Sequence, residues 1–412
     1  MYDIKIKNAR LRGRGSELFE IGMQGSSIAA IEHELPGGGT QEIDADGHLV
    51  TESFVYGHLH LCKVYTLERA GQKALEEYQQ NGMSNALDSI RSASEFKTQY
   101  DRHWIIENVR QACDLAVKHG VTHIRAFADV DSKGKLEGIA AVLQAKEEYA
   151  GKVDLQVVAF PQDGLIREPG TLALMEEALQ MGADVCGGIP WIEYTKEDEQ
   201  AHIDAVCQLA AEYDKDISML LDDVNDAEER TLEMLCKKVI EMGWQGRVTA
   251  QHCRAMALYP ENYFCKLTEL VRRAGIGFVT DPHTGPLHLR VKDLLRAGLP
   301  GGLGQDDIAD AYYPYGECNM LQVAFLASHL LWMTSFQDME ALYDMVTTSA
   351  ARVLGLKNHV LRVGGDADLV ILQDEDVYHA IWHHLPPAAV IKGGKLVVDK
   401  RFCNACPQRR NV

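Results

Sequence analysis

The chain has 412 residues, 46% of them hydrophobic, which is enough for one large core with a smaller domain beside it. A net charge of −19 excludes nucleic acids and anionic membranes as favourable partners, because like charges repel. The ten cysteines are scattered, and neither a signal-peptide pattern nor a run of 18 apolar residues occurs. We therefore expect a reduced, cytoplasmic protein with no membrane partner.

Both ends of the chain have the residue pattern of short strands. Residues 3–6 alternate in polarity, residues 28–31 are compact and apolar, and Pro-Gly-Gly-Gly at 36–39 breaks the chain. Residues 367–372 and 389–392 repeat the strand-like pattern before a Gly-Gly turn at 393–394. We predict that residues 1–50 and 356–412 are the two parts of one small β-sandwich domain.

Residues 51–355 alternate between short apolar strands and amphipathic helices. Beyond a first strand ending near residue 60, we predict strands at 121–128, 154–160, 183–189, 217–221, 248–252, 276–280 and 302–304. Helices are predicted between them at 172–179, 198–213, 227–242 and 261–274. Eight β-α units in about 300 residues indicate a (β/α)8 TIM barrel. In such barrels the active site lies at the C-terminal ends of the strands.

The first barrel strand ends in Phe-Val-Tyr-Gly-His-Leu-His at residues 54–60. Side chains of a strand alternate between its faces, so His58 and His60 point to the same side. Two imidazoles on one side can chelate a divalent metal ion.

Ordered sequence blocks make the chain resemble a known family. They lie at residues 54–60, 157–164, 246–252, 304–307, 313–320, 349–355 and 363–369. With these blocks the chain resembles the amidohydrolase superfamily, in particular the cytosine deaminase branch that includes the N-isopropylammelide aminohydrolases.

The resemblance implies a metal-dependent aminohydrolase, a hydrolase that acts on C–N bonds of a small heterocyclic substrate. It implies one Zn or Fe ion, with His58, His60 and Asp306 as ligands and Asp306 also as acceptor of the water proton. His252 would polarise the attacking oxygen, while Gln162 and Asp307 would contact the substrate. Relatives form homo-oligomers, so we expect the same of this chain.

The fifth barrel strand departs from the family pattern. Leu220 stands where the family has a metal histidine, and Asp223 stands where it has the catalytic glutamate. Three interpretations are open at this point. His252 joins the ligand set, or His58, His60 and Asp306 bind metal more weakly on their own, or the catalytic metal is weak or absent.

Other positions indicate a substrate with an apolar part. Phe127 and Trp191 replace histidines that relatives often carry, and with Leu220 they predict an apolar wall for a flat ring. His283, after the seventh strand, is a further candidate contact. Asp223 is a general acid/base, a substitute ligand or a solvated carboxylate.

We therefore expect hydrolysis of a C–N bond, with deamination of a pyrimidine-, triazine- or pterin-like ring. The alternative is a diverged relative with little or no catalytic metal that binds a heterocycle or performs non-hydrolytic chemistry.

Overall fold

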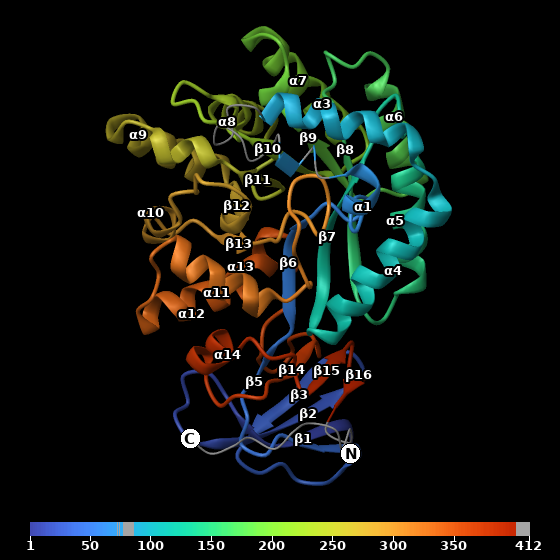
Figure 1. The fold of residues 1–412 in the computed structure, drawn as a ribbon. Coiled ribbons are helices and arrows are strands. Elements are labelled where there is room, and N and C mark those ends of the chain that lie inside the picture. Colours follow the sequence, from blue (N-terminus) through green and yellow to red (C-terminus); the bar gives the residue numbers. More distant parts are fainter. Residues whose placement is uncertain (72, 74, 77–85, 401–412) are drawn as a thin grey trace.

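The computed structural model describes residues 1–71, 73, 75, 76 and 86–400. A barrel of parallel strands ringed by helices forms the larger part, and two small sheets from both chain ends lie against one end of it (Figure 1). The predicted (β/α)8 barrel with a terminal β-sandwich is confirmed.

The barrel sheet has the order β13-β12-β11-β10-β9-β8-β7-β6. Its strands are β6 (Phe54–Leu59), β7 (Val121–Asp129), β8 (Asp154–Phe160), β9 (Val185–Gly188), β10 (Asp216–Leu221), β11 (Val248–His252), β12 (Gly277–Thr280) and β13 (Gly301–Leu303). A bridge between Leu59 and Asp306 brings the two outer strands together. Neighbouring C-terminal strand ends therefore meet around one opening.

Helices surround the barrel or lie at its two ends (Figure 1). They are α1 (Leu67–Ala70), α3 (Ala86–Phe96), α4 (Arg102–Lys118), α5 (Glu137–Glu148), α6 (Thr171–Met181), α7 (Lys196–Glu212), α8 (Thr231–Met242), α9 (Glu261–Ala274), α10 (Val291–Arg296), α11 (Met320–Leu330), α12 (Phe336–Asp344), α13 (Thr348–Val353) and α14 (Val377–His383). Short 3-10 turns are η1 (Lys97–Gln99), η2 (Pro190–Ile192), η3 (Arg254–Leu258) and η4 (Pro282–Thr284). Helix α3 crosses the end of the barrel that lies away from the terminal sheets (Figure 1).

The terminal sheets have the orders β3-β2-β1-β4 and β16-β15-β14-β5. Their strands are β1 (Tyr2–Arg10), β2 (Leu18–Gln24), β3 (Ser27–Glu32), β4 (Gly39–Asp44), β5 (Val50–Glu52), β14 (Leu369–Ile371), β15 (Ala389–Lys392) and β16 (Lys395–Asp399). One buried apolar cluster, with members from both sheets, holds them together. The predicted domain ranges, 1–50, 51–355 and 356–412, stay a prediction, and residues 401–412 lie outside the described residues.

Predicted strands and helices differ from the observed ones mainly at their ends. The strand predicted at 183–189 is observed only over Val185–Gly188, since the Ile189 amide donates to Nε2 of His202. The helix predicted from residue 227 begins at Thr231, where the Asp222 carboxylate accepts from the Thr231 hydroxyl and from the Leu232 amide. In the described part of the chain, no helix is long and apolar enough to cross a membrane.

Candidate active site

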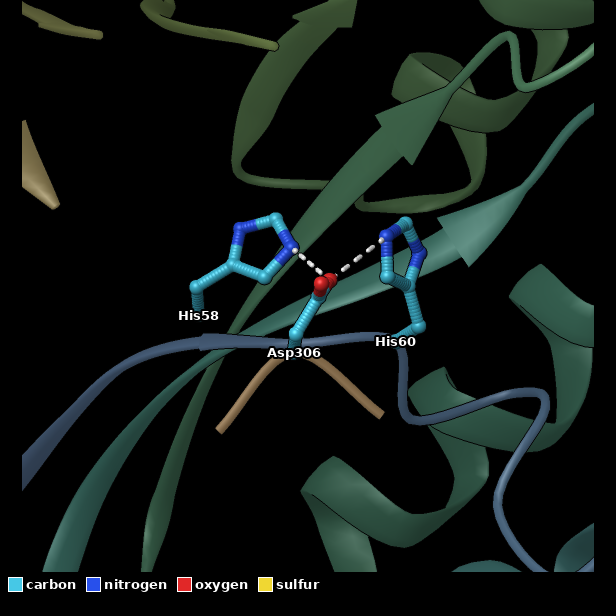
Figure 2. Close-up of side chains that lie close together, drawn as sticks. All are labelled: His58, His60 and Asp306. Carbon is cyan, nitrogen blue, oxygen red and sulfur yellow. Dashed lines mark hydrogen bonds and ion pairs between the residues drawn. The ribbon is translucent and has the colours of Figure 1, made fainter. Parts of the chain in front are cut away.

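Three side chains meet at the barrel opening where β6 and β13 end. His58 Nε2 lies 3.1 Å and His60 Nε2 lies 3.5 Å from the same carboxylate oxygen of Asp306, Oδ1 (Figure 2). All three residues are buried. Ligands of a tetrahedral ion at about 2.0–2.2 Å lie about 3.3 Å from one another, so these separations suit a divalent metal. One donor atom from each residue lies within 4.8 Å of the others.

The backbone fixes this arrangement. The His60 amide donates to the Asp306 carbonyl over 2.8 Å, and the Asp306 amide donates to the His58 carbonyl over 3.1 Å. Gly304 allows the close approach, because a Cβ there would collide with the Asp281 carboxylate and the His58 Cβ. Asp306 itself has a φ of 67°, a left-handed conformation that non-glycine residues rarely adopt outside special sites.

His252 ends β11 beside this cluster. Its Nε2 lies 3.7 Å from Asp306 Oδ1, and its Nδ1 lies 3.3 Å from Asp281 Oδ2. Burial lowers the pKa of His252 to about 4, and burial together with the Lys63 ammonium holds the pKa of His60 well below its usual range. These imidazoles are therefore neutral near pH 7, the state that binds a metal.

The ionisation state of Asp306 also suits it to bind a metal ion. Burial alone would raise the pKa of Asp306, but His252 and His58 beside it hold the pKa well below its usual range. An ionised carboxylate together with imidazole nitrogens forms a donor set that zinc and iron both accept. The residues present thus fit a divalent metal ion.

A cavity of about 410 Å³, including space open to solvent, lies in front of these residues. Its lining consists of His60, Lys63, Ile90, Gln162, Ile189, Trp191, Leu220, Asp223, His252, Arg254, Asp306, Asp307 and Tyr312. The sequence-predicted residues Gln162, Trp191, Asp223 and Asp307 therefore share one cavity with three of the predicted metal residues. His58 lies behind them, fully buried.

Two predicted contacts lie outside this lining. Phe127 packs against the His58 ring, with 4.1 Å between ring centroids. His283 is largely buried beside Tyr313, with 5.1 Å between ring centroids, and burial lowers its pKa to about 4. Both predictions stay open, since neither residue lines the cavity.

Leu220 makes one wall of the cavity apolar. It is buried on β10 and belongs to an apolar cluster of Phe127, Val158, Phe160, Val185, Ile189, Trp191, Ile192 and Leu220. The Trp191 indole Nε1 is buried and has no hydrogen-bond partner among the described residues. The wall thus offers hydrocarbon surface and one N–H group that a ligand or water would satisfy.

Asp223 is held by an arginine that the sequence patterns do not single out. The guanidinium of Arg254 donates to Asp223 Oδ1 over 2.6 Å, and its other arm lies 3.5 Å from Asp306 Oδ2 and donates to the Thr284 hydroxyl. Two consecutive left-handed residues, His252 and Cys253, turn the chain so that Arg254 returns to the cavity. Its position two residues after His252 is the signal that could have indicated it.

Lys63 is a second cation in the lining of the cavity. Its ammonium donates to Gln162 Oε1 over 2.9 Å, lies 3.9 Å from Asp307 Oδ1 and sits over the Tyr312 ring. Burial and the neighbouring Asp306 raise the pKa of Asp307 well above its usual range. Because Lys63 occupies the Gln162 oxygen, the amide NH2 of Gln162 is the group left for a ligand.

A second group of potential metal ligands lies between the barrel and a terminal sheet. His123, His359 and Asp368 come together there, all buried. The ammonium of Lys392 lies 2.7 Å from Asp368 Oδ2 and 3.2 Å from His123 Nε2. A lysine therefore supplies the cation at this place.

Comparison with known proteins gives consistent similarities. The amidohydrolase family profile matches residues 41–398. An N-isopropylammelide isopropyl amidohydrolase from Pseudomonas is 33% identical over 399 residues, covering 96% of this chain and 97% of that protein. A pterin deaminase from Rhizobium rhizogenes is 26% identical, with 85% and 80% covered.

Solved structures of similar proteins agree with these sequence similarities. A 5-methylcytosine deaminase from Klebsiella pneumoniae liganded with 5-fluorocytosine has a TM-score of 0.89 at 30% identity, with 99% of both chains covered. An N-isopropylammelide isopropylaminohydrolase from Burkholderia multivorans has a TM-score of 0.84 at 25% identity, covering 97% of this chain and 99% of that one.

Proposed function

Because the chain belongs to the amidohydrolase family, we propose that it is a metal-dependent hydrolase that cleaves a C–N bond on a nitrogen heterocycle. The observation that carries this proposal is the convergence of His58, His60 and Asp306 at the opening of the barrel. Relatives named for N-isopropylammelide, pterin and 5-methylcytosine support pyrimidine-, triazine- or pterin-like rings as substrates.

His58, His60 and Asp306 would hold the metal, and His252 is near enough to Asp306 to join them. A divalent metal bound there supplies Lewis acidity, which makes water acidic enough to react near neutral pH. We propose Zn or Fe as this ion. Leu220, on β10, has no donor atom, so it adds no fourth ligand to this set.

The remaining chemistry is assigned to residues around the cavity. Water adds its oxygen to the ring carbon, the C–N bond breaks, and the leaving amine takes one water proton while the other stays on the ring product. Asp306 takes a proton from water, and His252, neutral above a pH of about 4, stabilises the attacking oxygen. Asp223, anchored at Oδ1 by Arg254, carries the proton at Oδ2 toward the ring and the leaving amine.

Binding of the ring is shared between polar and apolar groups. The Gln162 amide and Asp307 orient the heterocycle, while Trp191, Ile189 and Leu220 accommodate an apolar substituent. A substituent of this kind on the leaving amine fits the hydrocarbon wall better than an unsubstituted amine. We further propose a homo-oligomer in the cytoplasm, which light scattering and cell fractionation would test.

The direct test is a panel of amino- and alkylamino-pyrimidines, triazines and pterins incubated with metal-loaded protein in water enriched in oxygen-18. Mass spectrometry should detect a released amine and a ring product that carries one heavy oxygen atom. The double variant His58→Ala/His60→Ala, prepared in parallel, should form no product. Absence of product from every compound would contradict the proposal.

A non-catalytic heterocycle-binding protein is the second candidate. The ion pair between Asp223 and Arg254 favours it, since a carboxylate committed to an arginine is less available for proton transfer. Thermal shifts of the protein with the same compounds, without product formation, would identify this case.

A further inference from the structure

A buried lysine lies within a cage of carboxylates next to the site. Lys97 is 2% exposed, and its Nζ lies 2.9 Å from Asp129 Oδ2 and 3.1 Å from both Asp131 Oδ2 and Asp163 Oδ1. Asp129 ends β7, and Asp163 follows β8. Burial alone would lower the pKa of Lys97, but the carboxylates, Asp129 foremost, raise it well above its usual range, so the ammonium stays charged.

Lys97 belongs to the covering segment, by which we mean α3 and η1, residues 86–99. This segment crosses the barrel end that holds the site (Figure 1), and its Ile90 lines the cavity and packs on the apolar cluster around Leu220. The Ser94 hydroxyl adds a second anchor, a hydrogen bond to Asp163. The covering segment is therefore tied to the barrel by charge at one end and by apolar contact in the middle.

Asp129 connects this anchor to the metal residues. Its second oxygen, Oδ1, faces His60 Nδ1 at 4.0 Å, while His60 Nε2 faces Asp306. His60 Nδ1 is buried and has no hydrogen-bond partner among the described residues, which leaves Asp129 as the carboxylate it faces. Histidines that bind metals usually give their second ring nitrogen to a carboxylate, which fixes the ring orientation and increases its basicity.

We propose that Lys97 is a positioning residue: it holds Asp129 against His60 and so couples seating of the covering segment to metal affinity. This inference rests on the metal site of the proposed function. Lys97 fixes Oδ2 of Asp129, and Oδ1 of the same carboxylate then orients the His60 ring. Ile90 of the covering segment closes the cavity wall above the substrate. Substrate contact with Ile90 and metal binding by His60 thereby support each other.

The test measures zinc affinity by competition with a chelator and the visible spectrum of the cobalt-loaded protein. Lys97→Met should weaken zinc binding about 10–100-fold, the usual effect of losing a group that orients a ligand. It should also change the cobalt spectrum, which reports ligand geometry. Lys97→Arg, which restores the charge, should recover most of the affinity.

Two further variants separate positioning from folding. Asp129→Asn keeps the shape of the side chain and should weaken zinc binding as Lys97→Met does, even if Lys97→Met fails to fold. Ser94→Ala removes a neighbouring hydrogen bond to Asp163 but leaves Lys97 seated on Asp129, so it should leave zinc affinity and the cobalt spectrum unchanged.

Wild-type zinc affinity and an unchanged cobalt spectrum in a folded Lys97→Met or Asp129→Asn protein would overturn the inference. That result leaves the proposed function intact if the wild type hydrolyses a heterocyclic amine. If the wild type binds zinc but hydrolyses none, the affinity series still supports the coupling while the proposed function fails. A wild type that binds no zinc contradicts both.

Discussion

Leu220 stands where the sequence resemblance leads us to expect a metal-binding histidine. It lies on β10, lines the cavity and is 4% exposed, so a nitrogen donor at this position would face the metal residues. The neighbouring Asp223 and Arg254 neutralise each other, and Arg254 also approaches Asp306 on the oxygen turned away from His58. Hydrocarbon and a neutralised ion pair therefore lie beside the three residues that would hold the metal.

Restoring the missing donor should strengthen the site. We expect Leu220→His to increase zinc affinity by roughly 100-fold, since about 10–16 kcal/mol of a full structural zinc site is shared among its ligands. Competition with a chelator measures the change, with Leu220→Met as the apolar control. Equal affinities of the two variants would mean that the side chain at 220 does not reach the metal.

Removing the Arg254 side chain should leave the Asp223 carboxylate buried without its ion-pair partner. Both partners of the Arg254–Asp223 pair are more than nine-tenths buried, so Arg254→Met is expected to lower the free energy of unfolding by about 3–5 kcal/mol in urea titration. Arg272→Met, which breaks the exposed pair with Glu269, should change it by less than about 1 kcal/mol. Similar losses in both variants would contradict the structural role of Arg254.

At the scale of elements, the site depends on how closely β13 approaches β6. The Leu59–Asp306 bridge and the backbone bonds of His60 and Asp306 hold the two strand ends together. The N-terminus of helix α8 is held by the residue that follows the fifth barrel strand. The Asp222 carboxylate accepts hydrogen bonds from Thr231 and Leu232, the first two residues of that helix. The side chains of the site are therefore positioned by strand ends rather than by long loops.

A methyl group between these strands should separate the metal residues. Gly304→Ala is expected to destabilise the fold by about 1–3 kcal/mol through overpacking and to reduce metal binding, since its Cβ would meet Asp281 and His58. Gly301→Ala, at the start of β13, is the control, because its nearest neighbour is the flexible end of Met345 at 3.2 Å. Metal titration and urea unfolding of both variants measure these effects. Normal metal binding by Gly304→Ala would contradict the claim that the close approach at Gly304 holds the metal residues together.

At the scale of the whole molecule, buried histidines make stability depend on pH. Burial lowers the pKa of His252 and of His283 to about 4, against about 6.5 in the unfolded chain. Between these values the unfolded state binds more protons, so stability decreases as pH falls from 6.5 to 4, by up to about 3 kcal/mol for each imidazole. Below pH 4 both states are protonated and this contribution levels off.

Urea unfolding of metal-free protein between pH 7 and 4 measures this dependence. His283→Gln should flatten the decrease relative to the wild type, because one of the buried imidazoles is removed. A wild-type stability that stays constant across this range would show that these histidines are solvated in solution.

Much of the molecule follows from local sequence patterns. The strands 154–160 and 248–252 and the helix 261–274 were predicted with their observed ends, because apolar runs and periodicity are local signals. The cluster of His58, His60 and Asp306 could be predicted because the sequence blocks around them resemble those of the amidohydrolase superfamily, whose ligand positions the resemblance carries over. Lys97 could not, since its role arises from contacts with Asp129 and Asp163, the second of them 66 positions away, which no local pattern encodes. For Arg254 the one local signal is its position two residues after His252.

The metal content of the purified protein tests the central claim most directly. Elemental mass spectrometry on protein prepared without chelator should find near one equivalent of zinc or iron. His58→Ala and His60→Ala should lose it, while the exposed-histidine control His33→Ala keeps it. No bound metal in the wild type, even after loading with zinc or iron, would contradict a metal-dependent hydrolase.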